Sequence, residues 1–155
     1  MCIRRAGEED IDSIVSLINE SNREAYEDII PSKLFEDPIL DRDEVEDMFR
    51  WMEFYVYESG GNIVGVAGLN VSDEKVGKVR WVHVLPGYRR EGIGTALMRH
   101  LENTARKKGL DKLVVYYVHE DADWAHEFYR KLGYDKEGEI SHRMGRCYLF
   151  VKRIK

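Results

Sequence analysis

The sequence predicts a mixed α+β fold, a single domain over residues 1–155 whose mostly antiparallel sheet of six to seven strands is flanked by about four helices. A chain of 155 residues with 43% hydrophobic residues is large enough for one core and too apolar for disorder. Segments with an apolar residue every three or four positions alternate with short β-branched and aromatic runs. Between Val79 and Val118 a strand, a helix and a strand follow one another, which predicts one parallel pair within the sheet.

The first half of the chain is predicted to contain a short strand, two helices and a β-hairpin. Ile11, Ile14 and Ile18 recur at helical spacing, and Val45 and Met48 do so before the hairpin. Two glycines in Ser59-Gly60-Gly61-Asn62 separate two β-rich runs, as in a tight hairpin turn. The predicted elements are a strand at Cys2–Ala6, helices at 9–22 and Asp43–Met52, and strands at Phe54–Tyr57 and Ile63–Leu69.

The second half is predicted to open with a strand, a glycine-rich loop and a helix. Leu97, Leu101 and Ala105 mark one face of that helix. Lys107-Lys108-Gly109 ends it, because cations and glycine suit a helix C-terminus. The predicted elements are strands at Val79–Leu85 and Leu113–Val118, a helix at Asp123–Leu132 that Gly133 stops, and strands near Ile140 and at Arg146–Lys152.

Composition and cysteine usage favour a cytoplasmic protein. The longest nearly apolar run, Ile63–Leu69, is far too short to cross a bilayer, and Arg4 and Arg5 are not followed by the apolar core of a signal peptide. Cys2 and Cys147 match no zinc spacing, so we expect two reduced thiols, with a bridge between them as the alternative. A net charge of −5 argues against general nucleic-acid binding.

The charges are unevenly distributed along the chain. From Glu20 to Glu58 there are 13 acidic and 4 basic residues, whereas from Lys78 to Lys112 there are 9 basic and 3 acidic ones. Two solvated faces of opposite sign would explain this pattern. The functional interpretation is an anion-binding half beside a half that faces cations.

The stretch VLPGYRREGIGT, from Val84 to Thr95, joins the strand to the helix and has the features of an anion-binding loop. It is not a Walker loop, because Ile93 and Gly94 occupy the positions that require Lys and Ser or Thr. It is not a dinucleotide fingerprint either, because Leu97 stands where glycine or alanine is needed. Backbone N–H groups at the start of the helix, with two arginines beside them, would still bind a pyrophosphate without a metal.

The motif Arg89-x-x-Gly92-x-Gly94, preceded by Val84-x-Pro86-x-Tyr88, resembles the acetyl-CoA-binding motif of the GNAT superfamily of N-acetyltransferases. The resemblance extends over nearly the whole chain. It includes Ile3-Arg4-Arg5-Ala6, Tyr26-x-x-Ile29-Ile30-Pro31 and Ala125-x-x-Phe128-Tyr129-x-x-x-Gly133-Tyr134. One departure is Ala122, where the family often has Asn; its effect is left open.

The resemblance implies that the chain moves an acetyl group from acetyl-CoA to a primary amine by direct attack in a ternary complex. It also implies that the parallel pair splays at the centre of the sheet, with pantetheine in the gap. Tyr129 would be the general acid that protonates the leaving thiolate, a role weighed against that of a core aromatic. The implied cofactor-binding residues are Val82, Val84, Arg89, Arg90, Gly92, Ile93, Gly94, Thr95, Ala125 and Tyr129.

Several features of the reaction are left open by the sequence. His83, His119 and Tyr117 are candidate bases, each more readily explained as structural, and a water that passes the proton to acidic residues is an equal alternative. Cys147 is not expected to be an acetylated nucleophile, because it is far from the motif in the sequence.

The acidic stretch predicts a cationic acceptor, such as a protein N-terminus, a lysine, a polyamine or a small amine. If the acceptor were anionic instead, Arg80 on the strand before the glycine loop would be the residue to examine. We expect no metal, no nucleic acid and no membrane among the partners, and a homodimer is compatible with the sequence. A non-catalytic acyl-CoA-binding sensor is the alternative function, and a nucleotide enzyme is a more remote one.

Overall fold

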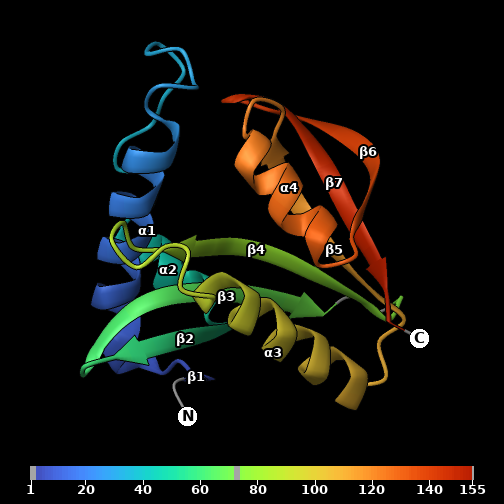
Figure 1. Ribbon diagram of the computed structural model, residues 1–155. Coiled ribbons are helices and arrows are strands. Elements are labelled where there is room, and N and C mark those ends of the chain that lie inside the picture. Colours follow the sequence, from blue (N-terminus) through green and yellow to red (C-terminus); the bar gives the residue numbers. More distant parts are fainter. Residues whose placement is uncertain (1–2, 72–73, 155) are drawn as a thin grey trace.

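The computed structural model describes residues 3–71 and 74–154, in which seven strands form one mixed sheet covered by helices (Figure 1). The strand order is β1-β2-β3-β4-β5-β7-β6, and only β4 and β5 pair in parallel. This confirms the predicted α+β fold and its parallel crossover. The elements are β1 Ile3–Arg5, a 3-10 turn at Glu8–Asp10, α1 Ile11–Tyr26, α2 Arg42–Met48, β2 Glu53–Ser59, β3 Asn62–Val71, β4 Val76–Val84, α3 Ile93–Lys107, β5 Lys112–His119, α4 Asp123–Lys131, β6 Asp135–His142 and β7 Gly145–Arg153.

The helices cover the two faces of the sheet and bury a core on each. On one face α1 and α2 pack on β2 and β3, where Phe54, Val56 and Val66 are buried. On the other face α3 and α4 cover Tyr55, Leu69 and the interior of β4 and β5. Neighbouring residues of β2 therefore enter different cores, as the alternation of side chains along a strand requires.

Two helix boundaries differ from the prediction. The first helix continues to Tyr26, beyond the predicted end at residue 22. The second ends at Met48, so the predicted end at Met52 is wrong. The N–H groups of Trp51 and Met52 both bond the carbonyl of Met48, at 3.1 and 2.9 Å, which turns the chain tightly into β2. The apolar residues after Met48 thus follow helical spacing without continuing the helix.

The predicted hairpin between β2 and β3 is confirmed. Ser59 pairs with Asn62, and Gly60 and Gly61 form the two-residue loop. Their φ angles of 59° and 82° are those of a turn that only glycine or a few polar residues adopt readily.

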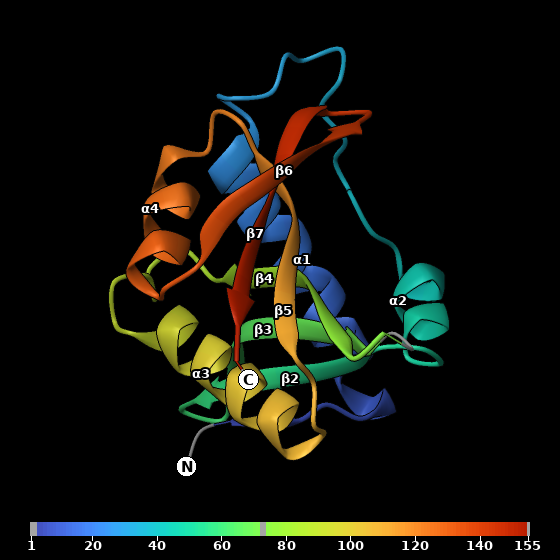
Figure 2. The same ribbon diagram turned by 90° about the vertical axis from the view of Figure 1, so that its right-hand side faces the viewer.

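The parallel pair separates partway along its length, as Figures 1 and 2 show from two directions. β4 and β5 are in register from Val76 opposite Lys112 to Val79 opposite Val115, and the pairing ends there. Each strand carries a register shift immediately afterwards, β4 against β3 and β5 against β7. At these bulges Trp81 and Tyr117 have φ angles of 62° and 63°, which bulky residues rarely adopt.

A buried ionic cluster ties α3 to the far half of the sheet. Glu102, only 1% exposed, accepts hydrogen bonds from Tyr134 Oη at 2.8 Å and Lys152 Nζ at 3.2 Å. Arg99 pairs with the same carboxylate at 2.9 Å. These three groups replace the hydration that the carboxylate loses in the core.

No helix in the described part of the chain combines the length and the apolarity that a membrane span requires.

Candidate active site

A cleft of about 690 Å³ opens where β4 and β5 separate. Its walls come from the last turns of α1, the loop before α3, the start of α4 and the turn between β6 and β7. The cleft therefore lies beyond the carboxyl ends of the paired segments of two parallel strands, where α/β sheets commonly bind ligands. All of the predicted site residues border it: those of the glycine loop, and also Val82, Val84, Ala125 and Tyr129.

The floor of the cleft is the backbone of β4. Leu85 donates its N–H to Val64 of β3 at 2.9 Å, and His83 lies opposite Val66 in the same ladder. Main-chain groups alternate in direction along a strand, so those of Val82 and Val84 face away from β3 and toward the gap. The main-chain groups of both residues therefore face the gap beside β5, where the carbonyl of Val84 accepts a hydrogen bond from Arg89 Nε.

The N-terminus of α3 lies at one end of the cleft. Gly92 is the N-cap, with φ of 80° and no side chain to cap the helix, and the first turn contains no acidic residue. The first intrahelical bond runs from Ala96 to Gly92, at 2.9 Å, so the N–H groups of Ile93, Gly94 and Thr95 precede it. These donors at the positive end of the helix dipole suit an anion.

Arg89 binds α1 and the end of β4. Its guanidinium forms an ion pair with Glu24, donates to Ser21 Oγ at 3.1 Å, and donates through Nε to the carbonyl of Val84 at 3.2 Å. Arg90 is exposed in the same loop, with φ of 66°. Both arginines border the cleft, and the contacts of Arg89 anchor the loop to the helix on the opposite wall.

Tyr129 of α4 lies on the wall between the two strands. It is 6% exposed and packs at 5.9 Å between ring centroids on both Tyr134 and Phe150. Its hydroxyl has no hydrogen-bond partner among the described residues, and it borders the cleft. Burial, with a smaller contribution from Tyr26, raises the pKa of the Tyr129 phenol.

Cys147 also borders the cleft, although it is distant from the glycine loop in the sequence. The premise that it lies far from the motif is therefore wrong, because β7 pairs with β5 and brings Cys147 opposite His119. Burial raises the pKa of its thiol to about 11, so it is a poor nucleophile near neutral pH. Cys147 is a free thiol. Cys2 lies outside the described residues, and the alternative of a bridge is not tested.

His119 is placed as a structural residue. Its Nδ1 accepts the N–H of Asp121 at 3.1 Å, so its Nε2 carries the proton and donates to the carbonyl of Met144 at 3.2 Å. Both ring nitrogens are therefore occupied in the neutral form. A histidine held in this way has no free lone pair with which to accept a proton from a substrate.

His83 of β4 connects the cleft floor to α1. Its Nδ1 lies 2.9 Å from Ser21 Oγ, and that oxygen accepts from Arg89. The hydroxyl proton of Ser21 is thus available for Nδ1, which assigns the ring proton of His83 to Nε2. Burial lowers the pKa of His83 to about 4, so the ring is neutral at physiological pH.

At the other end of the cleft Arg80 lies between two aromatic rings. Its guanidinium carbon is 4.8 Å from the ring centroid of Trp81 and 4.5 Å from that of Tyr117. His142 packs on Tyr117 at 5.1 Å and accepts the N–H of Met144 through Nδ1. All four side chains border the cleft.

Ala122 is the N-cap of α4 and is fully buried. Its carbonyl accepts the N–H groups of Ala125 and His126 at 2.9 and 3.1 Å, and no side chain caps the helix. In the family that the sequence resembles, this position often holds Asn; here it contributes only a methyl group and backbone.

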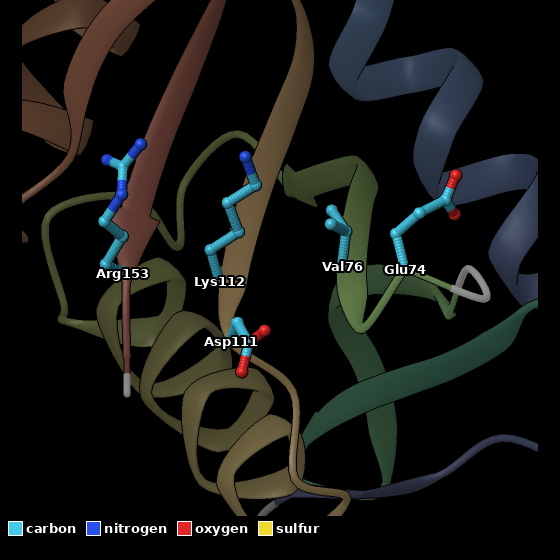
Figure 3. A pocket seen from close by; sticks show the side chains of 5 residues that line it. All are labelled: Glu74, Val76, Asp111, Lys112 and Arg153. Carbon is cyan, nitrogen blue, oxygen red and sulfur yellow. The ribbon is translucent and has the colours of Figure 1, made fainter.

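A second hollow, of about 430 Å³, lies at the opposite end of the parallel pair (Figure 3). It is an open surface between the starts of β4 and β5 and the end of β7, where side chains of both signs project, and Arg153 is paired with Glu137. None of the predicted site residues borders it. Its lining residues are Glu74, Val76, Asp111, Lys112 and Arg153.

Known proteins resemble this chain in sequence and in fold. The model of the acetyltransferase (GNAT) family matches residues 11–134. An uncharacterized N-acetyltransferase of Methanocaldococcus jannaschii is 30% identical over 57% of this chain and 44% of its own length. An amino-acid acetyltransferase of Pseudomonas putida is 33% identical over 73% of this chain and 24% of its own. The chain thus spans less than half the length of these curated relatives.

Among solved structures, the PaiA N-acetyltransferase of Thermoplasma acidophilum in complex with coenzyme A superposes with a TM-score of 0.84. The superposition covers 97% of each chain at 19% identity, which establishes a shared fold.

His83, which is half-buried on the cleft floor and desolvated there, should make the stability of the fold depend on pH. The unfolded chain binds a proton near pH 6.5, whereas the folded chain does so only near pH 4. The free energy of unfolding should therefore fall as the pH falls through this window, by roughly 2–3 kcal/mol, and His83 should have no effect above it. Urea unfolding between pH 7.5 and 4.5 should show a shallower loss in His83→Gln. Identical pH dependence in the two proteins would contradict the assignment of a buried neutral ring.

Proposed function

The chain belongs to the acetyltransferase (GNAT) family, whose model matches residues 11–134, and we propose that it transfers an acetyl group from acetyl-CoA to a primary amine. The observation that carries the proposal is the gap between β4 and β5. It exposes strand backbone along one side, ends at the uncapped N-terminus of α3 and has the phenol of Tyr129 on its wall.

The residues present suit the acetyl donor. Its pyrophosphate would lie on the N–H groups of Gly92, Ile93, Gly94 and Thr95, with Arg90 beside them and Arg89 within reach if it leaves Glu24. The pantetheine amides would bond the backbone of Val82 and Val84 that faces the gap, where Arg89 already bonds the carbonyl of Val84. Ala125 would leave room for the arm beside α4. When bound, this donor supplies an activated thioester carbonyl.

The proposed chemistry is a direct transfer. The neutral amine nitrogen forms a C–N bond to the thioester carbonyl carbon, the C–S bond breaks, and the sulfur leaves with the electron pair. A main-chain N–H near Val84 stabilises the charge on the carbonyl oxygen. Tyr129 gives its proton to the sulfur, and the proton lost by the amine passes to water.

The contacts of the histidines support water as the proton acceptor. His119 has both nitrogens occupied, and His83, with a pKa of about 4, is too weak a base to compete for an ammonium proton. Water at the open end of the cleft carries no such restriction.

The charge of the acceptor stays a prediction. Of the acidic residues in α1 and the segment after it, Glu24 borders the cleft, and Arg89 neutralises it. The field of the remaining exposed carboxylates would still favour the approach of an ammonium group. A cytoplasmic location and a homodimer also stay predictions.

Acetyl-CoA should bind the native protein without added metal, and Gly94→Glu should weaken this binding by at least about tenfold. A glutamate there adds a negative charge at the anion site, and its Cβ would lie 3.2 Å from Phe128 on the cleft wall. Calorimetry gives the dissociation constants. Asn103→Glu adds the same charge to the exposed far part of α3 and is the matched control. Equal affinity in native protein and folded Gly94→Glu would show that the loop is not the pyrophosphate site.

Tyr129→Phe should lower kcat by roughly 10²–10⁴-fold while stability barely changes, because the ring keeps its packing and only the proton is lost. Tyr134→Phe is the control with the reverse expectation, a loss of stability without a loss of turnover. It removes a hydrogen bond to buried Glu102, so it should cost about 1.5–3 kcal/mol of stability and leave turnover unchanged. Thiol release and urea unfolding measure the two effects. Unchanged turnover in Tyr129→Phe would mean that Tyr129 only packs in the core and is not the general acid. Binding of acetyl-CoA by the native protein without any thiol release would favour a non-catalytic sensor.

The rate should rise with pH as the acceptor ammonium loses its proton. With saturating acetyl-CoA, kcat/KM for the amine should increase about tenfold per pH unit below the pKa of that amine. His83 is already neutral in this range, and the raised pKa of Tyr129 keeps its phenol protonated. Profiles from pH 6 to 9 for two amines of different pKa should shift by that difference. An inflection near pH 6.5 that disappears in His83→Gln would instead identify His83 as the base.

A further inference from the structure

Arg80 is a cation in the cleft without an anionic partner. Of the other arginines in the loop and on α1, Arg89 pairs with Glu24 and Arg23 with Asp37, whereas Arg90 is exposed to solvent. Arg143, in the turn between β6 and β7, is paired with Glu36 at 2.9 Å. Within residues 3–71 and 74–154, the guanidinium of Arg80 has neither an ion pair nor a hydrogen bond, only its two ring contacts.

The position of Arg80 is fixed by the two bulges. Trp81 and Tyr117, the residues with positive φ, supply the two rings that flank the guanidinium. Such stacking holds the plane of an arginine while it leaves the N–H donors at its edge free. Partial burial lowers the pKa of Arg80, because no carboxylate compensates for the lost hydration. The cleft therefore holds the guanidinium of Arg80 in a fixed position, with N–H donors that no anion occupies.

We propose that Arg80 binds a carboxylate of the acceptor, so that the acceptor is a small amino acid. The proposal rests on the proposed function, since it assigns the other end of the molecule that is acetylated. Val82, whose backbone faces the gap, lies two residues farther along β4, across the bulge at Trp81 and so within about 7 Å. A carboxylate held by Arg80 would thus leave an amine a few bonds away near the gap.

The other groups that face this end of the cleft favour a carboxylate. Arg80 is beside the uncharged rings of Trp81 and Tyr117, and His142 packs on the far side of Tyr117. A planar guanidinium matches a carboxylate through two parallel hydrogen bonds. A second ammonium, as in a diamine, would be repelled there. The ammonium of an amino acid would face away from Arg80, toward Tyr129 and the open side of the cleft.

The experiment compares each amino acid with its own carboxamide. Short α- and ω-amino acids and their amides are offered with acetyl-CoA, and kcat/KM is expressed per concentration of neutral amine. The native protein should prefer the acid by about 10- to 100-fold. Arg80→Gln should abolish the preference and keep the rate with amides, and Arg80→Lys should retain part of it. A dipeptide, whose carboxylate lies farther from the amine, should react more slowly than the best amino acid.

Lys78→Gln is the matched control. Lys78 is a cation of the same strand that packs on Tyr116 at 5.8 Å and does not border the cleft. Its loss should leave the preference for acids unchanged. An equal drop in both variants, or an equal loss of acid and amide rates in Arg80→Gln, would mean that Arg80 acts only through the general field or the fold.

Binding separates the two proposals. Calorimetry of the acids and amides in the presence of coenzyme A needs no turnover. If acids bind through Arg80 and nothing is acetylated, the proposed function fails and the carboxylate site stands. If amides or diamines are acetylated as well as acids or better, the carboxylate site fails and the proposed function stands. A preference for diamines that shrinks with added salt would support a cationic acceptor instead.

Discussion

The end of parallel pairing after Val79 and Val115 is the constraint on which the site depends. A continuous ladder would occupy the backbone of β4 with β5 and leave no cleft. The bulges at Trp81 and Tyr117 turn the strands apart, and a left-handed conformation costs roughly 1–2 kcal/mol at each non-glycine residue. The indole N–H of Trp81 is also buried without a partner in the described chain. The two cores on either side of the sheet offset these costs, so the strain is concentrated where ligands would bind.

The helix α1 forms one wall of the cleft, and a series of contacts connects it to β4. Glu24 holds Arg89, Arg89 holds Ser21, and Ser21 bonds His83 on β4. Arg89 also bonds the carbonyl of Val84, the last residue of that strand. The loop before α3 is therefore positioned by long-range contacts as well as by its own glycines. A ligand anion at the helix terminus would compete with Glu24 for Arg89, so the first helix and the donor site are physically coupled.

Local patterns in the sequence were sufficient for the elements and for one end of the site. Helical spacing, the Gly60-Gly61 turn and the loop from Arg89 to Thr95 depend on neighbours in the chain, and these predictions agree with the structure apart from helix ends. The roles assigned to the predicted site residues stay predictions. Ser21 and Trp81 were missed because neither belongs to a motif. Arg80 and Cys147 reach the cleft only through strand pairing and the bulges, which periodicity does not reveal. The glycine spacing indicated the loop directly, whereas Arg80 was only an alternative for an anionic acceptor, since no local pattern indicates the bulge beside it.

Burial of Tyr129 poses a question about its role as an acid, since a raised pKa makes a phenol a weaker proton donor. A thiolate formed in the same apolar cleft is destabilised for the same reason. Cys147, a thiol of this chain on the cleft wall, experiences the same effect, because burial raises its pKa to about 11. A leaving thiolate in the cleft would become a stronger base for the same reason, which narrows the mismatch between the pKa values of the phenol and the thiol. What counts for the proton transfer is the difference between the pKa values of the phenol and the thiol, and burial in the cleft raises both of them.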